Sequence, residues 1–316
     1  MSSVTSGSQK IMKPRSDWDR TMDRGFIWLT RIFAFAVAVI LIWITVQVAI
    51  KAWPAITEFG FGFITSTNWD PVRNQYGALP QLYGTIASSA IALLIAVPVG
   101  IGVALFLSED YLPPRIQVVI VFLVELLAAI PSVVYGLWGI FVLIPLLKVV
   151  GNWLNASLGW LPIFSTPLRG PGLLPAALVL AIMVLPTIAA LSRDALISLP
   201  PDLRQASVGL GATRWETILK VLLPSAFSGI VGAVMLALGR ALGETMAVTM
   251  LIGNSNNISP SILAPSNTIA SLLANQFAEA SGLQVAALMY AALILFVLTL
   301  LVNILAQILI ERVQRI

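Results

Sequence analysis

Two charged side chains, Arg240 and Glu244, lie inside a long apolar stretch of the sequence, GRALGETMAVTMLIGN over residues 239–254. Residues four apart lie on the same face of a helix, so the two side chains could form an ion pair. A charge near the centre of a bilayer is costly, and it usually faces a cavity or a partner. Two interpretations stay open: a neutralised structural pair, or an anion pathway in which Glu244 positions Arg240.

Gly239 and Gly243 flank this pair at a spacing of four residues. Small residues at that spacing let another helix approach closely in a membrane. The pattern therefore predicts a helix packed beside Arg240, from this chain or from another one.

Other chemistry is excluded by residue type. The chain has no Cys and no His, which excludes disulfides, thiol nucleophiles, imidazole catalysis and zinc sites of the Cys/His kind. It also lacks the Gly-x-x-x-x-Gly-Lys-Ser/Thr phosphate loop, because none of its lysines follows a glycine. We therefore expect no catalytic residue, no metal and no cofactor, and no ATP binding through such a loop.

A second informative segment covers residues 199–224, LPPDLRQASVGLGATRWETILKVLLP. Asp202 with Gln205, and Thr213 with Glu216, have the spacing of a capping box, in which a side chain at the start of a helix pairs with the residue three positions on. The segment thus contains two consecutive helix-start signals.

Gly209 and Gly211 separate these two signals, and Pro224 follows the second one. Glycine commonly ends a helix, and proline cannot continue one. The expected structure is a short helix, a glycine turn and a second helix stopped by Pro224. By these signals alone, an ordinary structured loop is the favoured interpretation.

The composition shows what must position these residues. Of 316 residues, 58% are hydrophobic and only 10% are charged, with a mean hydropathy of +0.94. A soluble domain carries about a quarter charged residues, so a soluble enzyme is excluded and a bilayer is the expected solvent. The net charge is +4, but the basic residues form no aromatic-interleaved patch, so nucleic acid is not an expected partner.

Six transmembrane helices are expected in an all-α polytopic membrane protein. The first is a retained signal-anchor span, since its 19 residues exceed the apolar core of a cleaved signal peptide. The expected spans are residues 32–50, 82–107, 126–147, 173–191, 225–253 and 285–310.

The stretch 116–150 is too long for one crossing and too short for two with a proper loop. A single crossing at 126–147, preceded by an interfacial helix at 116–125, places thirteen Lys and Arg residues inside and four outside, with Arg240 within a span. This agrees with the positive-inside rule. It predicts cytoplasmic tails at 1–31 and 311–316, and a cytoplasmic loop at 199–224.

A glutamate and two prolines in the stretch 116–150 give weaker predictions. Glu125 is expected to be an interfacial cap or an ion-pair partner rather than a site residue. Pro131 and Pro145 permit kinks in the third span.

The segment 199–224 resembles the cytoplasmic loop of ATP-binding-cassette importer permeases. That family pattern is Glu-Ala-Ala, three residues, Gly, nine residues, Ile, any residue, Leu-Pro. At the same spacing this chain has Gln205, Ala206, Ser207, Gly211, Val221, Leu223 and Pro224. The resemblance implies that the loop docks on a separate ATPase and transmits its motion, while Gln205 removes the charge of the family's usual Glu.

Three further stretches resemble the C-type membrane subunit of the bacterial Pst phosphate importer. They are LSEDYLPPR at 107–115, ELLAAIPSVVYGLWG at 125–139 and the residues 239–254 already described, together with 83–86. The resemblance implies a type I importer permease fold and inorganic phosphate uptake across the bacterial cytoplasmic (inner) membrane. It also implies a second homologous permease subunit, two ATP-binding subunits and an extracytoplasmic phosphate-binding protein.

Other functions stay open at this stage. A permease for sulfate or molybdate is the nearest alternative, because these oxyanions are similar in size and charge. A secondary anion carrier would explain the spans and Arg240 but not the patterned loop. A sensory or scaffold membrane protein could use the loop but would not explain the charges in the fifth span.

Overall fold

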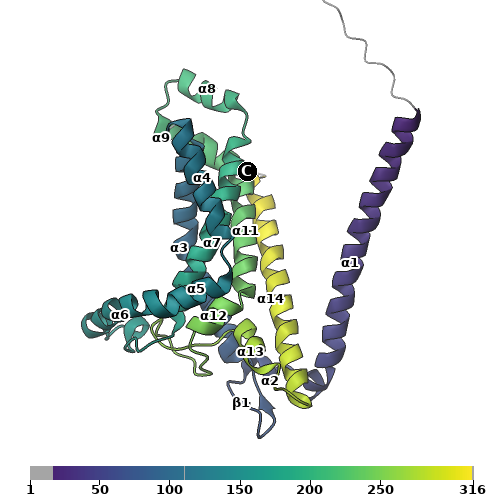
Figure 1. The fold of residues 1–316 in the computed structure, drawn as a ribbon, viewed down its shortest axis with the longest axis vertical. Helices are drawn as coiled ribbons and strands as arrows, with labels where there is room; N and C mark the ends of the chain where they lie inside the picture. Colours follow the sequence, from purple (N-terminus) through teal and green to yellow (C-terminus); the bar gives the residue numbers. More distant parts are fainter. Residues whose placement is uncertain (1–16, 110, 315–316) are drawn as a thin grey trace, which may run out of the picture. The chain divides into compact units, whose positions relative to one another are not determined.

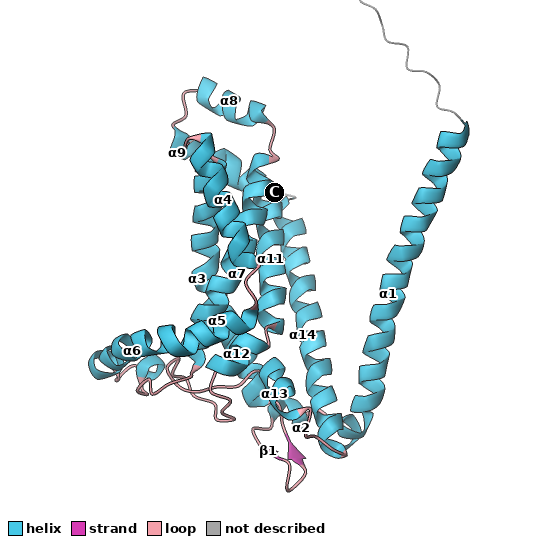
Figure 2. Ribbon diagram, viewed as in Figure 1, coloured by secondary structure: helices cyan, strands magenta, loops and turns pink. Residues whose placement is uncertain are grey.

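The structure, a computed structural model, describes residues 17–109 and 111–314. It is helical apart from a two-stranded antiparallel hairpin of β1 (Trp69–Asp70) and β2 (Gln75–Tyr76) (Figures 1 and 2). The all-α class expected from the sequence is confirmed. The chain divides into two compact units, one up to Ile50 and one from Lys51 onward.

The first helix, α1 (Asp17–Phe59), begins in the first unit and ends in the second. It begins before the expected span at 32, because the charged residues Arg20, Arg24 and Arg31 are compatible with a helix. Their charges limit only the apolar part of the helix. The predicted tail at 1–31 is therefore helical from Asp17, while residues 1–16 lie outside the described residues.

The second unit contains the remaining helices. Five helical segments of the described chain are long and apolar enough to cross a membrane, or six if the bent pair 214–225 and 227–243 counts as one span. The helices are α2 (Gly62–Thr65), α3 (Leu79–Ser108), α4 (Pro114–Ala128), α5 (Ser132–Trp138), α6 (Ile144–Leu158), α7 (Leu173–Ile197), α8 (Pro201–Gly209), α9 (Arg214–Thr217), α10 (Leu223–Ser225), α11 (Phe227–Gly243), α12 (Met246–Leu251), α13 (Ile269–Gln276) and α14 (Leu283–Gln314).

The third expected span is divided differently from the prediction. The helix α4 ends at Ala128, and α5 begins at Ser132 after Pro131, so residues 126–147 are not one continuous helix. Proline has no N–H to donate and restricts the residue before it to extended conformations, which explains the break. Residues 116–125 belong to α4, which packs against α7, whereas α5 and α6 run across the direction of α4 (Figure 2).

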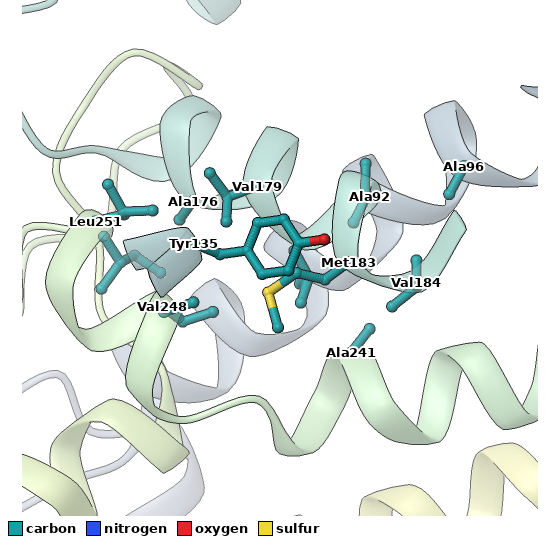
Figure 3. Close-up of a cluster of buried hydrophobic side chains, with 14 of the residues drawn as sticks. Ala92, Ala96, Tyr135, Ala176, Val179, Met183, Val184, Ala241, Val248 and Leu251 are labelled. Carbon is teal, nitrogen blue, oxygen red and sulfur yellow. The ribbon is translucent and has the colours of Figure 1, made fainter. Parts of the chain in front are cut away.

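The main core lies where α3 packs on α7. Ala92, Ala96, Gly100 and Ala104 are buried at a spacing of four residues on one face of α3. An added Cβ at Gly100 would lie 2.8 Å from a side-chain carbon of Ile188, so the two helices approach closely because this face is small. Figure 3 shows Ala92 and Ala96 in the same buried cluster as Tyr135 and Met183.

A second core holds the segment that follows α1. Phe63 is fully buried and stacks on Tyr290 of α14, with ring centroids 4.6 Å apart. Tyr76 packs edge-on against Trp69 across the hairpin at 5.1 Å. These aromatic contacts hold the hairpin and α2 against α14, although the connection is long and contains little regular structure.

The other two long loops, at 159–172 and 252–268, are held against each other by backbone hydrogen bonds. Ile262 N–H donates to Ile163 at 3.0 Å, and Leu173 N–H donates to Ala264 at 3.0 Å. These loops therefore stabilise each other through long-range backbone hydrogen bonds, which no local sequence pattern predicts.

Candidate functional site

Arg240 lies in α11 and lines an open groove of about 560 Å³. Three helices form the groove, α7, α11 and α14, with α11 packed against each of the other two. Its lining residues are Thr187, Gly232, Met235, Leu236, Gly239, Arg240 and Asn303. Arg240 as a residue is half-buried, and its guanidinium group forms no ion pair or hydrogen bond with the part of the chain that the structure describes.

The expected pair between Arg240 and Glu244 is not formed. The helix α11 ends at Gly243, and Glu244 has extended backbone angles (φ −65°, ψ 123°), so the two side chains no longer share a helical face. The carboxylate instead accepts a hydrogen bond of 3.4 Å from Ala247 N–H, at the start of α12. The prediction of one continuous helix over 225–253 was wrong here, because glycine is a poor helix former and the Glu244 carboxylate bonds to one free N–H at the start of the next helix.

The described residues provide no helix in close contact with Gly239 and Gly243. An added Cβ at either glycine would meet no described atom within 4 Å. This face of α11 is therefore open, and Leu236 beside it is 61% exposed.

Thr187 and Asn303 also line the groove, and sequence reasoning missed both. Thr187 lies near the middle of α7, and Asn303 lies on a face of α14 whose neighbours Leu300 and Ile304 are exposed and apolar. A polar side chain inside a predicted span is unusual, and that signal could have identified them. Neither side chain carries a charge, so a search for charges within the spans does not identify them.

The loop at 199–224 has the expected helix–turn–helix form, with one correction. The helix α8 begins at Pro201 and has no side-chain cap, so the capping box predicted at Asp202 and Gln205 is wrong. Two consecutive prolines fix the backbone for a helix start without one. The capping box at Thr213 and Glu216 is confirmed, with both reciprocal hydrogen bonds present.

The turn between α8 and α9 depends on Gly211. Its φ is +86°, in the region that favours glycine, and an added Cβ would meet nothing within 4 Å. After α9 the chain continues as a π-helical stretch at 218–222 and as α10, which ends at Ser225 rather than before Pro224. The following helix α11 is bent by 68° from this segment.

The remaining residues of the loop motif separate into exposed and buried positions. Gln205 and Ala206 are exposed on α8, whereas Ser207 is buried and bonded to Thr217 across 2.9 Å between their hydroxyl oxygens. Val221 lies half-buried in the π-helical stretch. Leu223 and Pro224 lie in α10, where Leu223 packs against a buried apolar cluster.

The loop is tied to α3 by a short ion pair. Arg204 of α8 donates to the carboxylate of Glu109, just after α3, at 2.8 Å. Glu109 is 8% exposed. Two further donors, Gln117 of α4 at 2.6 Å and Arg193 of α7 at 3.3 Å, bond to the carbonyl of Leu107. The end of α3 thus connects α4, α7 and α8.

Glu125 is placed differently from the expectation. It is an exposed residue within α4, not at a cap, and the described residues provide it no ion-pair partner. It borders a small hollow that Arg193 and Asp194 of α7 also line. These two pair with each other at 3.6 Å.

Comparison with known protein families identifies the family of this chain. A model of the family described as "binding-protein-dependent transport system inner membrane component" matches residues 96–315. The chain belongs to this family. Members are permease components, so this chain is a multi-pass inner membrane protein and not an enzyme.

Among its relatives, the phosphate transport system permease protein PstC of Haemophilus influenzae is 44% identical over 311 residues, which covers 96% of this chain and 98% of that protein. PstC 1 of Mycobacterium tuberculosis is 38% identical and covers 91% and 93%. A probable PstC of Methanocaldococcus jannaschii is 39% identical and covers 80% and 82%.

Two solved structures show the same fold. One chain of a bacterial alginate ABC transporter has a TM-score of 0.59 at 17% identity and covers 92% of this chain and 97% of that one. A chain of the MetNI methionine ABC transporter has a TM-score of 0.52 at 20% identity, with 77% and 95% covered. At these identities the likeness concerns the fold alone.

Proposed function

We propose that this chain is the membrane-spanning subunit of an ATP-driven importer that moves inorganic phosphate across the bacterial cytoplasmic membrane. The observation that carries the proposal is identity of 38–44% with phosphate transport permeases over almost the whole chain. Such identity covers both the groove and the loop. A sulfate or molybdate permease and a secondary carrier are the competing functions.

Arg240 is the residue proposed to attract the anion. It is the one cationic side chain within α11, and it lines a groove without a carboxylate close enough to pair with it among the described residues. An unpaired guanidinium in a membrane is expensive unless it faces water, a partner or an anion. Glu244 has a separate role in this proposal, which is to cap α12 and so fix the end of α11.

The segment α8–α9 is proposed to dock on an ATPase subunit. Leu210 is 90% exposed at the turn, and Trp215 is 63% exposed on α9. Exposed apolar side chains of this size on a loop indicate a protein contact surface. Gln205 and Ala206 belong to the same surface, and the Arg204–Glu109 pair would pass its motion to α3.

The proposed complex contains a second homologous permease subunit, two ATP-binding subunits and an extracytoplasmic phosphate-binding protein. The open face at Gly239 supports the second permease, because a membrane subunit would cover Leu236 and complete the groove. Isolation of the tagged chain should recover an ATPase. Recovery of the chain without one would favour a secondary carrier.

The proposed topology places both termini and α8 in the cytoplasm. The chain has no native cysteine, so single cysteines report accessibility cleanly. Cysteines at the exposed positions Ser157 and Asn257 should react with an impermeant reagent from outside, while one at Gln205 should not. Outside labelling at Gln205 would contradict the topology and the docking role.

Phosphate uptake is the deciding test of the substrate. Cells with and without this chain should be compared for uptake of labelled phosphate, with excess sulfate or molybdate as competitor. We expect uptake to require the chain and to resist both competitors. Chain-dependent uptake of sulfate or molybdate instead would establish the alternative.

A further inference from the structure

The Arg240 groove contains neutral hydrogen-bonding groups that no part of the described chain satisfies. The hydroxyl of Thr187 and the amide of Asn303 form no hydrogen bond with any described residue, and both line the groove with Arg240. Thr187 differs in this from other helical threonines, since Thr45, Thr249 and Thr299 each donate to a carbonyl three or four residues earlier. Thr187 therefore remains able to bond to another molecule.

Thr187 is half-buried and Asn303 is exposed on the groove, so both groups can be reached by a polar molecule that binds beside Arg240. Their chemistry limits what that molecule can be. Arg has five N–H donors and no acceptor, whereas the Thr hydroxyl and the Asn carbonyl can both accept. The groove thus offers donors and acceptors to the same ligand.

Phosphate and sulfate differ in the use they can make of acceptors. At neutral pH phosphate keeps a proton on at least one oxygen, and that P–OH group is a donor. Sulfate has only acceptor oxygens, which would face the oxygens of Thr187 and Asn303 without a proton between them. A site built to accept a ligand's proton disfavours the analogue that lacks it.

We infer that Thr187 and Asn303 accept hydrogen bonds from the protonated oxygens of phosphate while Arg240 binds the unprotonated ones, so the groove itself discriminates phosphate from sulfate. This inference rests on the proposed function, in which phosphate passes Arg240. The inference assigns anion selectivity to the permease itself, in addition to any selectivity of the extracytoplasmic binding protein.

The test measures weak anion binding to the assembled transporter in lipid nanodiscs, without its binding protein. Phosphorus NMR saturation transfer at millimolar inorganic phosphate reports binding, and sulfate is added as the competitor. We expect the wild-type complex to bind sulfate about tenfold more weakly than phosphate, which is the difference in affinity that one good hydrogen bond provides. In the Thr187→Val, Asn303→Leu double variant the two anions should compete within about twofold.

Matched controls separate this effect from a structural one. Thr299→Val removes a hydroxyl from α14 that is already bonded to Phe296, so the preference for phosphate should stay at the wild-type value. Thr187→Ser keeps the hydroxyl and should also keep the preference. Equal competition by sulfate in the wild type, or an unchanged preference in the double variant, would overturn the inference.

The Arg240→Gln variant distinguishes a failure of this inference from a failure of the proposed function. It should lose the phosphate signal, because the cation is gone. If Arg240→Gln binds phosphate as the wild type does, the proposed anion path is wrong. If it loses binding while sulfate competes equally in the wild type, the path stands and only the inference on Thr187 and Asn303 fails.

Discussion

Two arginines in this chain have opposite surroundings. Arg204, on the loop, is paired at 2.8 Å with the nearly buried carboxylate of Glu109. Arg240, in the groove, has no partner within the described chain, although Glu244 follows it by four residues. The charge of Arg204 is satisfied within this subunit, and that of Arg240 is left for another molecule.

The difference supports the roles proposed for the two regions. A paired charge between α8 and the end of α3 makes a rigid connection, which suits the transmission of motion. An unpaired charge among Thr187, Asn303 and an open helix face suits binding, because its hydrogen-bonding capacity is unused. The charges alone would not separate these roles, since both are arginines close in sequence to an acidic residue.

Arg240→Gln tests the proposed anion-binding role of the Arg240 groove and should have the largest effect. We expect phosphate transport per assembled complex to fall by at least about a hundredfold, since an anion path then loses its positive charge. Arg240→Lys should retain a fraction of transport, because the charge remains while the planar fork is lost. Uptake in vesicles, normalised to recovered complex, measures both.

Glu244 provides the control for that variant. Since its carboxylate caps α12 and does not pair with Arg240, Glu244→Gln should keep most of the activity. The Arg240→Glu, Glu244→Arg exchange should not transport phosphate. Full transport by this exchanged variant would show a structural ion pair and contradict the role of Arg240 in the path.

Gly211→Val tests the proposed coupling role of the α8–α9 loop through its backbone. A side chain at φ +86° costs about 1–2 kcal/mol, so the α8–α9 turn should change and transport should fall about tenfold. Gly209→Ala is the matched control, because Gly209 ends α8 at a negative φ with equally open surroundings. Transport and ATPase activity should be measured together at normal protein abundance. Normal transport by Gly211→Val would contradict the coupling role.

Glu109→Gln tests the same connection through the charge. Arg204 is partly exposed and can be solvated when its partner is neutral, so the expected cost is only about 1 kcal/mol. We expect a several-fold rise in ATP hydrolysed per phosphate transported, with assembly intact. Glu279→Gln, far along the chain and without an ion pair among the described residues, is the control that should leave this ratio unchanged.

The smallest effect concerns the capping box. Hydrogen bonds from the backbone and hydroxyl of Thr213, with the nearby Lys220, lower the pKa of Glu216 from 4.5 to about 2. A lowered pKa means that the ionised carboxylate stabilises the start of α9 above pH 4.5, and that this contribution is lost as the pH falls toward 2. Fluorine NMR of a labelled Trp215 should show a transition in that window, which Glu216→Gln should abolish.

The loop could be largely predicted from sequence, because its signals are local. Thr213 with Glu216 fixes one helix start, and Gly211 supplies a turn that few other residues could adopt. The failure at Asp202 has a local cause as well, since the helix begins at Pro201 with Pro200 as its N-cap, two residues before the predicted N-cap. Such features depend on neighbours within four residues.

The Arg240 site could be predicted only in part. Its charge inside a span was visible, but the pairing with Glu244 assumed a helix that continues past Gly243. Thr187 and Asn303 lie 53 and 63 residues from Arg240 along the chain. Their meeting in one groove depends on how α7, α11 and α14 pack.

The sequence by itself determined that this is a helical membrane protein and that residues 199–224 form a helix–turn–helix, because hydropathy and capping act over short distances. Tertiary structure decided which arginine is paired and which polar groups share the groove. Those outcomes depend on packing between distant helices, where the small face of α3 against α7 and the open face of α11 each set how closely a neighbour can approach.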